Sequence, residues 1–148
     1  MTGYFCDRAL IGQEVLDRVY LTIEGGRFTS VQAESEWIPD ATHLHGITIP
    51  GMANTHSHAF HRALRSRTQA DRGSFWTWRN LMYAAAERLD PDNYHRLATA
   101  VFAEMTLAGI TSVGEFHYVH HQPGGKSYAN PNAMGEAVLS AATEAGLR

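Results

Sequence analysis

The 148-residue chain has little cysteine, no long hydrophobic run and no strong excess of either charge. Its single cysteine, Cys6, cannot form a disulfide within the chain, which is typical of proteins in reducing compartments. No stretch approaches the ~20 apolar residues of a membrane helix, and the first residues lack the pattern of a secretory signal. A formal charge of −3 gives no electrostatic reason to expect a nucleic-acid partner. We therefore expect a cytoplasmic protein without nucleic-acid or membrane partners.

The first third of the chain has the pattern of a β-sheet. Residues 18–33 form two alternating runs on either side of Gly25-Gly26, and this pattern predicts a hairpin. Residues 47–56, ITIPGMANTH, are apolar and contain glycine, so we expect one further extended stretch there.

From residue 74 the hydrophobic period changes from two residues to that of a helix. Helices with a capping residue or an early proline at the start and glycine near the end are predicted at residues 74–89, 90–109 and 130–146. Residues 110–116, ITSVGEF, are predicted to be a strand, and Leu147-Arg148 to begin another. This alternation predicts a parallel α/β sheet. Because a parallel sheet buries both faces and needs more strands than these, we interpret the chain as the N-terminal part of a longer protein.

Nine histidines include two His-x-His pairs, which stand in different contexts. His43 and His45 precede the apolar stretch in a polar connection, and we interpret them as surface residues. His56 and His58 come at the carboxyl end of the stretch, where α/β barrels place their chemistry. Residues two apart on a strand point to the same side, and two imidazoles can share one metal ion. From spacing and position alone, the second pair is either a metal site or two ordinary histidines placed together by chance.

A catalytic zinc site usually has three protein ligands, and the spacing leaves the third one open. Four further histidines are candidates by chemistry alone: His61, His117, His120 and His121. The third ligand could also lie in the part of the longer protein that follows residue 148.

Three segments carry a resemblance to a known family: GMANTHSHAFHRALRSRT at 51–68, GSFWTWRNLMYAAAERL at 73–89 and GITSVGEFHYVHH at 109–121. They resemble the amidohydrolase superfamily and, within it, the formimidoylglutamate deiminases. The resemblance covers nearly the whole chain but only about the first third of such an enzyme. It implies a small β-domain segment at residues 1–48. It also implies that residues 49–148 form the first two βα units of a metal-dependent (β/α)8 TIM barrel.

The resemblance also implies roles for individual residues. His56 and His58 would bind one Zn2+, with Fe2+ left open as the alternative. Arg79 would bind a substrate carboxylate, and Tyr118 would contact the substrate. His61 stands where some members have a glutamine that touches the substrate. The remaining metal ligands and the proton-transfer residues would come from later strands, beyond residue 148.

The implied reaction is hydrolysis of N-formimino-L-glutamate to N-formyl-L-glutamate and ammonia, a step of histidine degradation. The implied partner is a small molecule with glutamate-type carboxylates, and a homodimer of the complete enzyme is left open. One alternative is another amidohydrolase-type deaminase that acts on a neutral base, which would not need the cation of Arg79. A second alternative is a truncated chain without catalysis.

Overall fold

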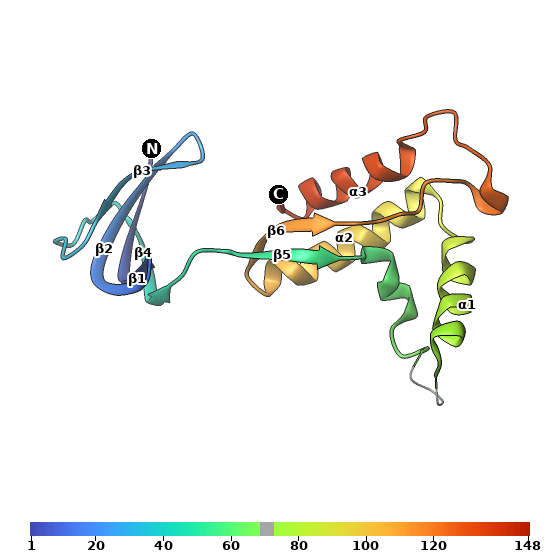
Figure 1. Ribbon diagram of the computed structural model, residues 1–148. Helices are drawn as coiled ribbons and strands as arrows, with labels where there is room; N and C mark the ends of the chain where they lie inside the picture. The colour runs from blue at the N-terminus through green and yellow to red at the C-terminus, as the bar shows by residue number, and fades with distance from the viewer. Residues whose placement is uncertain (69–72) are drawn as a thin grey trace. The chain divides into compact units, whose positions relative to one another are not determined.

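The computed structural model describes residues 1–68 and 73–148 and divides the chain into two compact units (Figure 1). Unit 1 comprises residues 1–50 and unit 2 comprises residues 51–148. No helix in these described ranges is long and apolar enough to cross a membrane.

Unit 1 is a four-stranded sheet in the order β3-β2-β1-β4. Its strands are β1 (Thr2–Ile11), β2 (Glu14–Glu24), β3 (Arg27–Gln32) and β4 (Thr42–Thr48). The predicted hairpin is confirmed as β2 and β3, which pair antiparallel across Gly25 and Gly26. Both glycines have positive φ, 57° and 74°, as a tight hairpin turn requires. β1 pairs antiparallel with β2 but parallel with β4.

The prediction of one extended stretch over residues 47–56 is wrong, because two strands share it. β4 ends at Thr48, and β5 (Met52–Ser57) belongs to the sheet of unit 2. Pro50 lies in the break between them, where a residue without a backbone N–H suits the end of a ladder. His43 and His45 consequently lie on β4 and not in a polar connection.

Unit 2 alternates strands and helices. Its elements are β5, the 3-10 helix η1 (Ala59–Leu64), α1 (Phe75–Ala86), α2 (Pro91–Leu107), β6 (Ile110–Glu115), the 3-10 turn η2 (Pro123–Gly125) and α3 (Ala133–Glu144). β5 and β6 pair in parallel, which confirms the predicted parallel α/β arrangement. The largest fully buried side chains of this unit are Phe60, Tyr94, Phe102 and Met134, so η1, α2 and α3 share one core.

Capping explains where two of the helices begin. Ser74 and Asp90 each accept a hydrogen bond from the backbone three residues ahead and complete a capping box. The third helix begins later than predicted. The Asn130 side chain accepts from the N–H of Asn132 at 3.0 Å, which closes a local turn, and α3 begins only at Ala133. The first helix ends at Ala86, short of the predicted end.

The last two residues run beside β6, as predicted for the start of another strand. The Arg148 N–H donates to the Thr111 carbonyl at 3.1 Å, and the Val113 N–H donates to the Arg148 carbonyl at 2.8 Å. Arg148 thus both donates to and accepts from β6, which is the hydrogen-bond pattern of a neighbouring strand. It lies on the edge of β6 that β5 does not occupy.

Candidate functional site

His56 and His58 lie at the carboxyl end of β5 and face one another. Their ring centroids are 5.0 Å apart, and the rings are inclined by 78°. An imidazole nitrogen binds zinc at about 2.0–2.1 Å, which places each ring centroid roughly 3 Å from the ion. Two such ligands at a tetrahedral angle hold their centroids roughly 5 Å apart. The pair therefore has a spacing that one zinc ion would fit.

A backbone carbonyl at the end of the neighbouring strand fixes the orientation of His58. Nδ1 of His58 lies 2.7 Å from the carbonyl oxygen of Phe116, which follows β6. Because a carbonyl can only accept, Nδ1 carries the proton. Nε2 of the neutral ring then keeps its lone pair, which is the arrangement found in most metal-binding histidines.

Glu115, the last residue of β6, forms a second link between the carboxyl ends of β5 and β6, besides the His58–Phe116 hydrogen bond. Its Oε1 accepts from the N–H of Ala59 at 2.7 Å, so it holds the beginning of η1 against β6. Its Oε2 and Nδ1 of His117 are buried without a hydrogen-bond partner among the described residues. Burial lowers the pKa of His117, and the neighbouring His120 lowers it further. From the sequence, Glu115 and His117 are candidates for orienting the metal-binding residues, and the sequence leaves this role open.

His61 and Tyr118 form a direct pair beside the two histidines. The Tyr118 hydroxyl lies 2.6 Å from Nε2 of His61, and the His61 ring stands edge-on to Trp78 at 5.6 Å. Burial lowers the pKa of His61, and the charge of His58 would lower it further. Burial raises the pKa of Tyr118, so at neutral pH the phenol keeps its proton and its O–H can donate a hydrogen bond to a neutral imidazole.

The backbone of Tyr118 is in a strained conformation. Its φ is +31°, in the left-handed region that a bulky side chain rarely adopts. Such residues persist where surrounding contacts hold them, and they cluster at binding and catalytic sites. The hydrogen bond to His61 is one such contact, and Met82 of α1 makes another with its Sδ 3.5 Å from the hydroxyl.

Arg79 lies on α1, one turn before Met82 and Tyr83. Its guanidinium packs over the Tyr83 ring at 4.8 Å from the centroid and over the Trp76 ring at 5.7 Å. Nη2 also reaches the Tyr83 hydroxyl at 3.5 Å. Stacking of this kind covers the flat face of a guanidinium and leaves the N–H groups at its edge, other than the one that reaches Tyr83, available to a carboxylate.

Two hollows border these side chains. One, of about 220 Å³, is lined by Thr55, His56, Ser57, His58, Gly114 and Phe116. The other, of about 170 Å³, includes Met82, Tyr83 and Tyr118 in its wall. The structure thus brings His56, His58, His61 and Tyr118 into one contiguous group, and it places Arg79 on the helix that flanks Tyr118. Within the described ranges, no third histidine, cysteine or carboxylate completes a ligand set with His56 and His58.

The other His-x-His pair also makes a specific contact. His43 and His45 both approach the carboxylate of Asp7 on β1. His45 is exposed, as predicted for a surface residue, whereas His43 is partly buried. Hydrogen bonds from His43 and from the backbone N–H of Gly46 hold the pKa of Asp7 below its usual value.

The chain belongs to the amidohydrolase family, whose model matches residues 47–148. It is 38% identical to formimidoylglutamate deiminase of Pseudomonas aeruginosa, in an alignment that covers 99% of this chain and 33% of that protein. An amidohydrolase from Brucella melitensis, known as a crystal structure, superposes with a TM-score of 0.93 at 33% identity, over 99% of this chain and 33% of that one.

Atrazine chlorohydrolase from Arthrobacter aurescens, crystallised with zinc, superposes with a TM-score of 0.80 at 23% identity, over 100% of this chain and 34% of that one. At that identity the likeness shows the fold alone. The chain spans about a third of the length of these relatives. The predicted fold class is confirmed: an α/β chain of the amidohydrolase class, preceded by a small β-sheet.

Proposed function

We propose that the complete protein carrying this chain is a zinc-dependent formimidoylglutamate deiminase. In this reaction water adds to the formimino carbon of N-formimino-L-glutamate, the C=N bond breaks, and N-formyl-L-glutamate and ammonia form. The observation that carries the proposal is the His56–His58 pair, with its rings 5.0 Å apart and Nδ1 of His58 held by the Phe116 carbonyl. The relative from P. aeruginosa supports the choice of reaction.

The donor set fits a borderline-soft divalent ion. Two imidazole nitrogens suit zinc, and Nε2 of His58 is left as the free donor of that ring. Zinc supplies Lewis acidity and makes hydroxide available at neutral pH. The chain's own contribution is orientation: His58 is fixed by Phe116, and Glu115 ties the start of η1 to β6. These contacts hold the His58 donor and the start of η1 in place before any substrate arrives.

The substrate-binding role falls to Arg79, Tyr118 and His61. A guanidinium can bind a carboxylate with two parallel hydrogen bonds, which suits a glutamate-type substrate. The Tyr118 hydroxyl, paired with His61 at 2.6 Å, offers a polar group at a fixed position near the histidine pair. Binding of the glutamate end would orient the formimino carbon, so that binding energy serves positioning.

The remaining parts of the site are proposed to come from the rest of a TIM barrel. These are the further metal ligands and the residues that transfer protons. The backbone bonds between Arg148 and β6 support a next strand at that edge. We place the complete enzyme in the cytoplasm.

The test is the effect of Arg79→Met on kinetics of the complete protein with N-formimino-L-glutamate. Hydrogen bonds to charged groups contribute about 1.5–3 kcal/mol each. We therefore expect the variant to lose about 3 kcal/mol or more of transition-state stabilisation, which lowers kcat/KM more than roughly 100-fold. Zinc content should stay unchanged, because Arg79 contacts Trp76 and Tyr83 and lies on α1, not at the strand ends.

Arg96→Met is the matched control, since Arg96 is an exposed arginine of α2. It should leave kcat/KM nearly unchanged. Near-normal kinetics of Arg79→Met would show that Arg79 is a helix-surface residue. Turnover of a neutral nucleobase in place of N-formimino-L-glutamate would favour the other amidohydrolase-type deaminases.

A further inference from the structure

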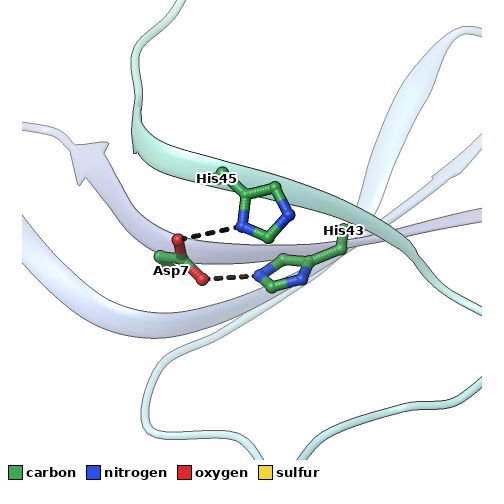
Figure 2. A group of neighbouring side chains, drawn as sticks. All are labelled: Asp7, His43 and His45. Atoms are coloured by element: carbon green, nitrogen blue, oxygen red, sulfur yellow. Dashed lines mark hydrogen bonds and ion pairs between the residues drawn. The ribbon is translucent and has the colours of Figure 1, made fainter.

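Asp7, His43 and His45 converge on one face of the unit 1 sheet, as Figure 2 shows. Asp7 comes from β1, and the two histidines come from β4, its parallel neighbour at the edge of the sheet. Phe5 is paired with His43, so Asp7, two residues further along β1, lies on the same side as the His43 ring.

A β-bulge brings the second histidine to the carboxylate. Cys6 pairs with Leu44 and Arg8 with Ile47, so two residues of β4, His45 and Gly46, oppose the single residue Asp7. Gly46 has a φ of +81°, a conformation that favours glycine. Bulges are rare between parallel strands, and they re-aim side chains where they occur. Here the bulge turns the His45 ring and the Gly46 N–H toward the same carboxylate.

The donor atoms lie close together, and a shared metal ion would need them to move slightly apart, since the His43 and His45 ring centroids are 3.9 Å apart. Nε2 of His43 lies 2.5 Å from Oδ1 of Asp7, and Nδ1 of His45 lies 3.5 Å from Oδ2. One donor atom from each of the three residues lies within 4.8 Å of the others. Ligands at about 2.0–2.2 Å around a tetrahedral ion are separated by roughly 3.3–3.6 Å. Opening the His43–Asp7 contact by roughly 1 Å would therefore reach the geometry of a bound ion.

Neighbouring groups hold two of the three donors in place. The His43 ring packs edge-on against Trp37 at 5.1 Å and Phe5 at 5.8 Å. The Gly46 N–H donates to Oδ2 of Asp7 at 3.0 Å. Supporting contacts of this kind orient metal ligands. The His45 side chain is 79% exposed and that of Asp7 42%, so an ion can enter from solvent and water can complete its coordination.

We propose that Asp7, His43 and His45 bind one divalent transition-metal ion, Zn2+ among them, at the edge of the unit 1 sheet. Two imidazoles and one carboxylate form a ligand set of the kind that zinc accepts. The ion would cross-link β1 to β4, whose ligands are 36 residues apart in the chain. It is separate from the His56–His58 pair and does not depend on the proposed function.

The test is a calorimetric Zn2+ titration of the complete protein carrying His56→Ala and His58→Ala. We expect one ion per chain at the new site. In the same background, Asp7→Asn and His45→Ala should each weaken this binding at least about 10-fold, since even the loss of a group behind a ligand costs 10–100-fold in metal affinity. Asp40→Asn and His121→Ala, which remove an exposed carboxylate and an exposed imidazole, are the matched controls and should bind as the background does.

Thermal unfolding with and without Zn2+ is a second test, which is needed if a variant folds poorly. At the same concentration, Zn2+ should raise the thermal midpoint of the background protein more than that of His45→Ala, which lacks the most exposed ligand. If the background takes up no zinc, or if Asp7→Asn and His45→Ala bind it as the background does, the three residues form an ion pair and the proposal is wrong.

Discussion

His58 connects the chemistry of one strand end to the backbone of the next. Its Nδ1 donates to the Phe116 carbonyl at 2.7 Å, which leaves Nε2 as the donor to a metal. That the pair His56 and His58 would share one side could be predicted from their spacing. That a carbonyl 58 residues away in the chain would select the tautomer could not, because local sequence carries no information on that contact.

Replacing His58 with alanine in the complete protein should remove one equivalent of zinc and reduce deiminase activity at least about 100-fold. The expected loss is at least that caused by removing a group behind a ligand. Metal analysis by mass spectrometry and an ammonia assay measure the two effects. His95→Ala is the control, because His95 lies on α2 and pairs with Glu144 at 3.3 Å, outside the histidine group.

Zinc content that falls equally in both variants would contradict the assignment. A His58→Ala variant that keeps full activity would also contradict the assignment. The Asp7 cluster does not confuse the readout, since its ligands are intact in both proteins.

At the scale of the elements, β5 and β6 can approach each other closely because Gly51 has no side chain. A Cβ at Gly51, just before β5, would lie 2.2 Å from Cγ2 and 2.8 Å from Cβ of Thr111. Rotating the Thr111 side chain cannot relieve the second contact, because its Cβ is fixed to the backbone. We expect Gly51→Ala to destabilise the protein by about 1–3 kcal/mol, the usual cost of overpacking.

Denaturant unfolding of the complete protein measures this change. Gly114→Ala is the matched control in the same strand pair, since a Cβ there meets Thr55 at an ordinary 3.6 Å. Its stability should change by no more than about 0.5 kcal/mol. Equal stability of the two variants would show that β5 and β6 can separate at Gly51 without cost.

Element boundaries show how far local signals reach. Two capping boxes, at Ser74 and Asp90, made α1 and α2 predictable at their first residues. The start of α3 was missed because Asn130 closes a turn with Asn132, and a capping residue and a turn residue have the same chemistry. The break at Pro50 was missed because apolar residues continue on both sides of it.

At the scale of the whole molecule, the alternation of strands and helices made the α/β class predictable, since it needs only local periodicity. The sheet of unit 1 was harder to predict. β1 pairs in parallel with β4 across more than thirty intervening residues, and no local pattern encodes that partner. The Asp7 cluster depends on this pairing, and for that reason the sequence did not indicate it.

Large apolar side chains remain exposed in unit 2. Phe116 is 66% exposed and Leu139 70%. Together with the strand-like bonds of Arg148 to β6, this exposure supports further packing elements in the proposed barrel.

Ammonia release from N-formimino-L-glutamate, measured side by side for the complete protein and for residues 1–148 with added zinc, tests the central claim most directly. The complete protein should release ammonia in a reaction that a metal chelator stops. Residues 1–148 should not exceed the zinc-only blank, because a catalytic zinc site usually has three protein ligands and the described residues bring only His56 and His58 together there. No ammonia from the complete protein, or turnover by residues 1–148 that His56→Ala abolishes, would contradict the account.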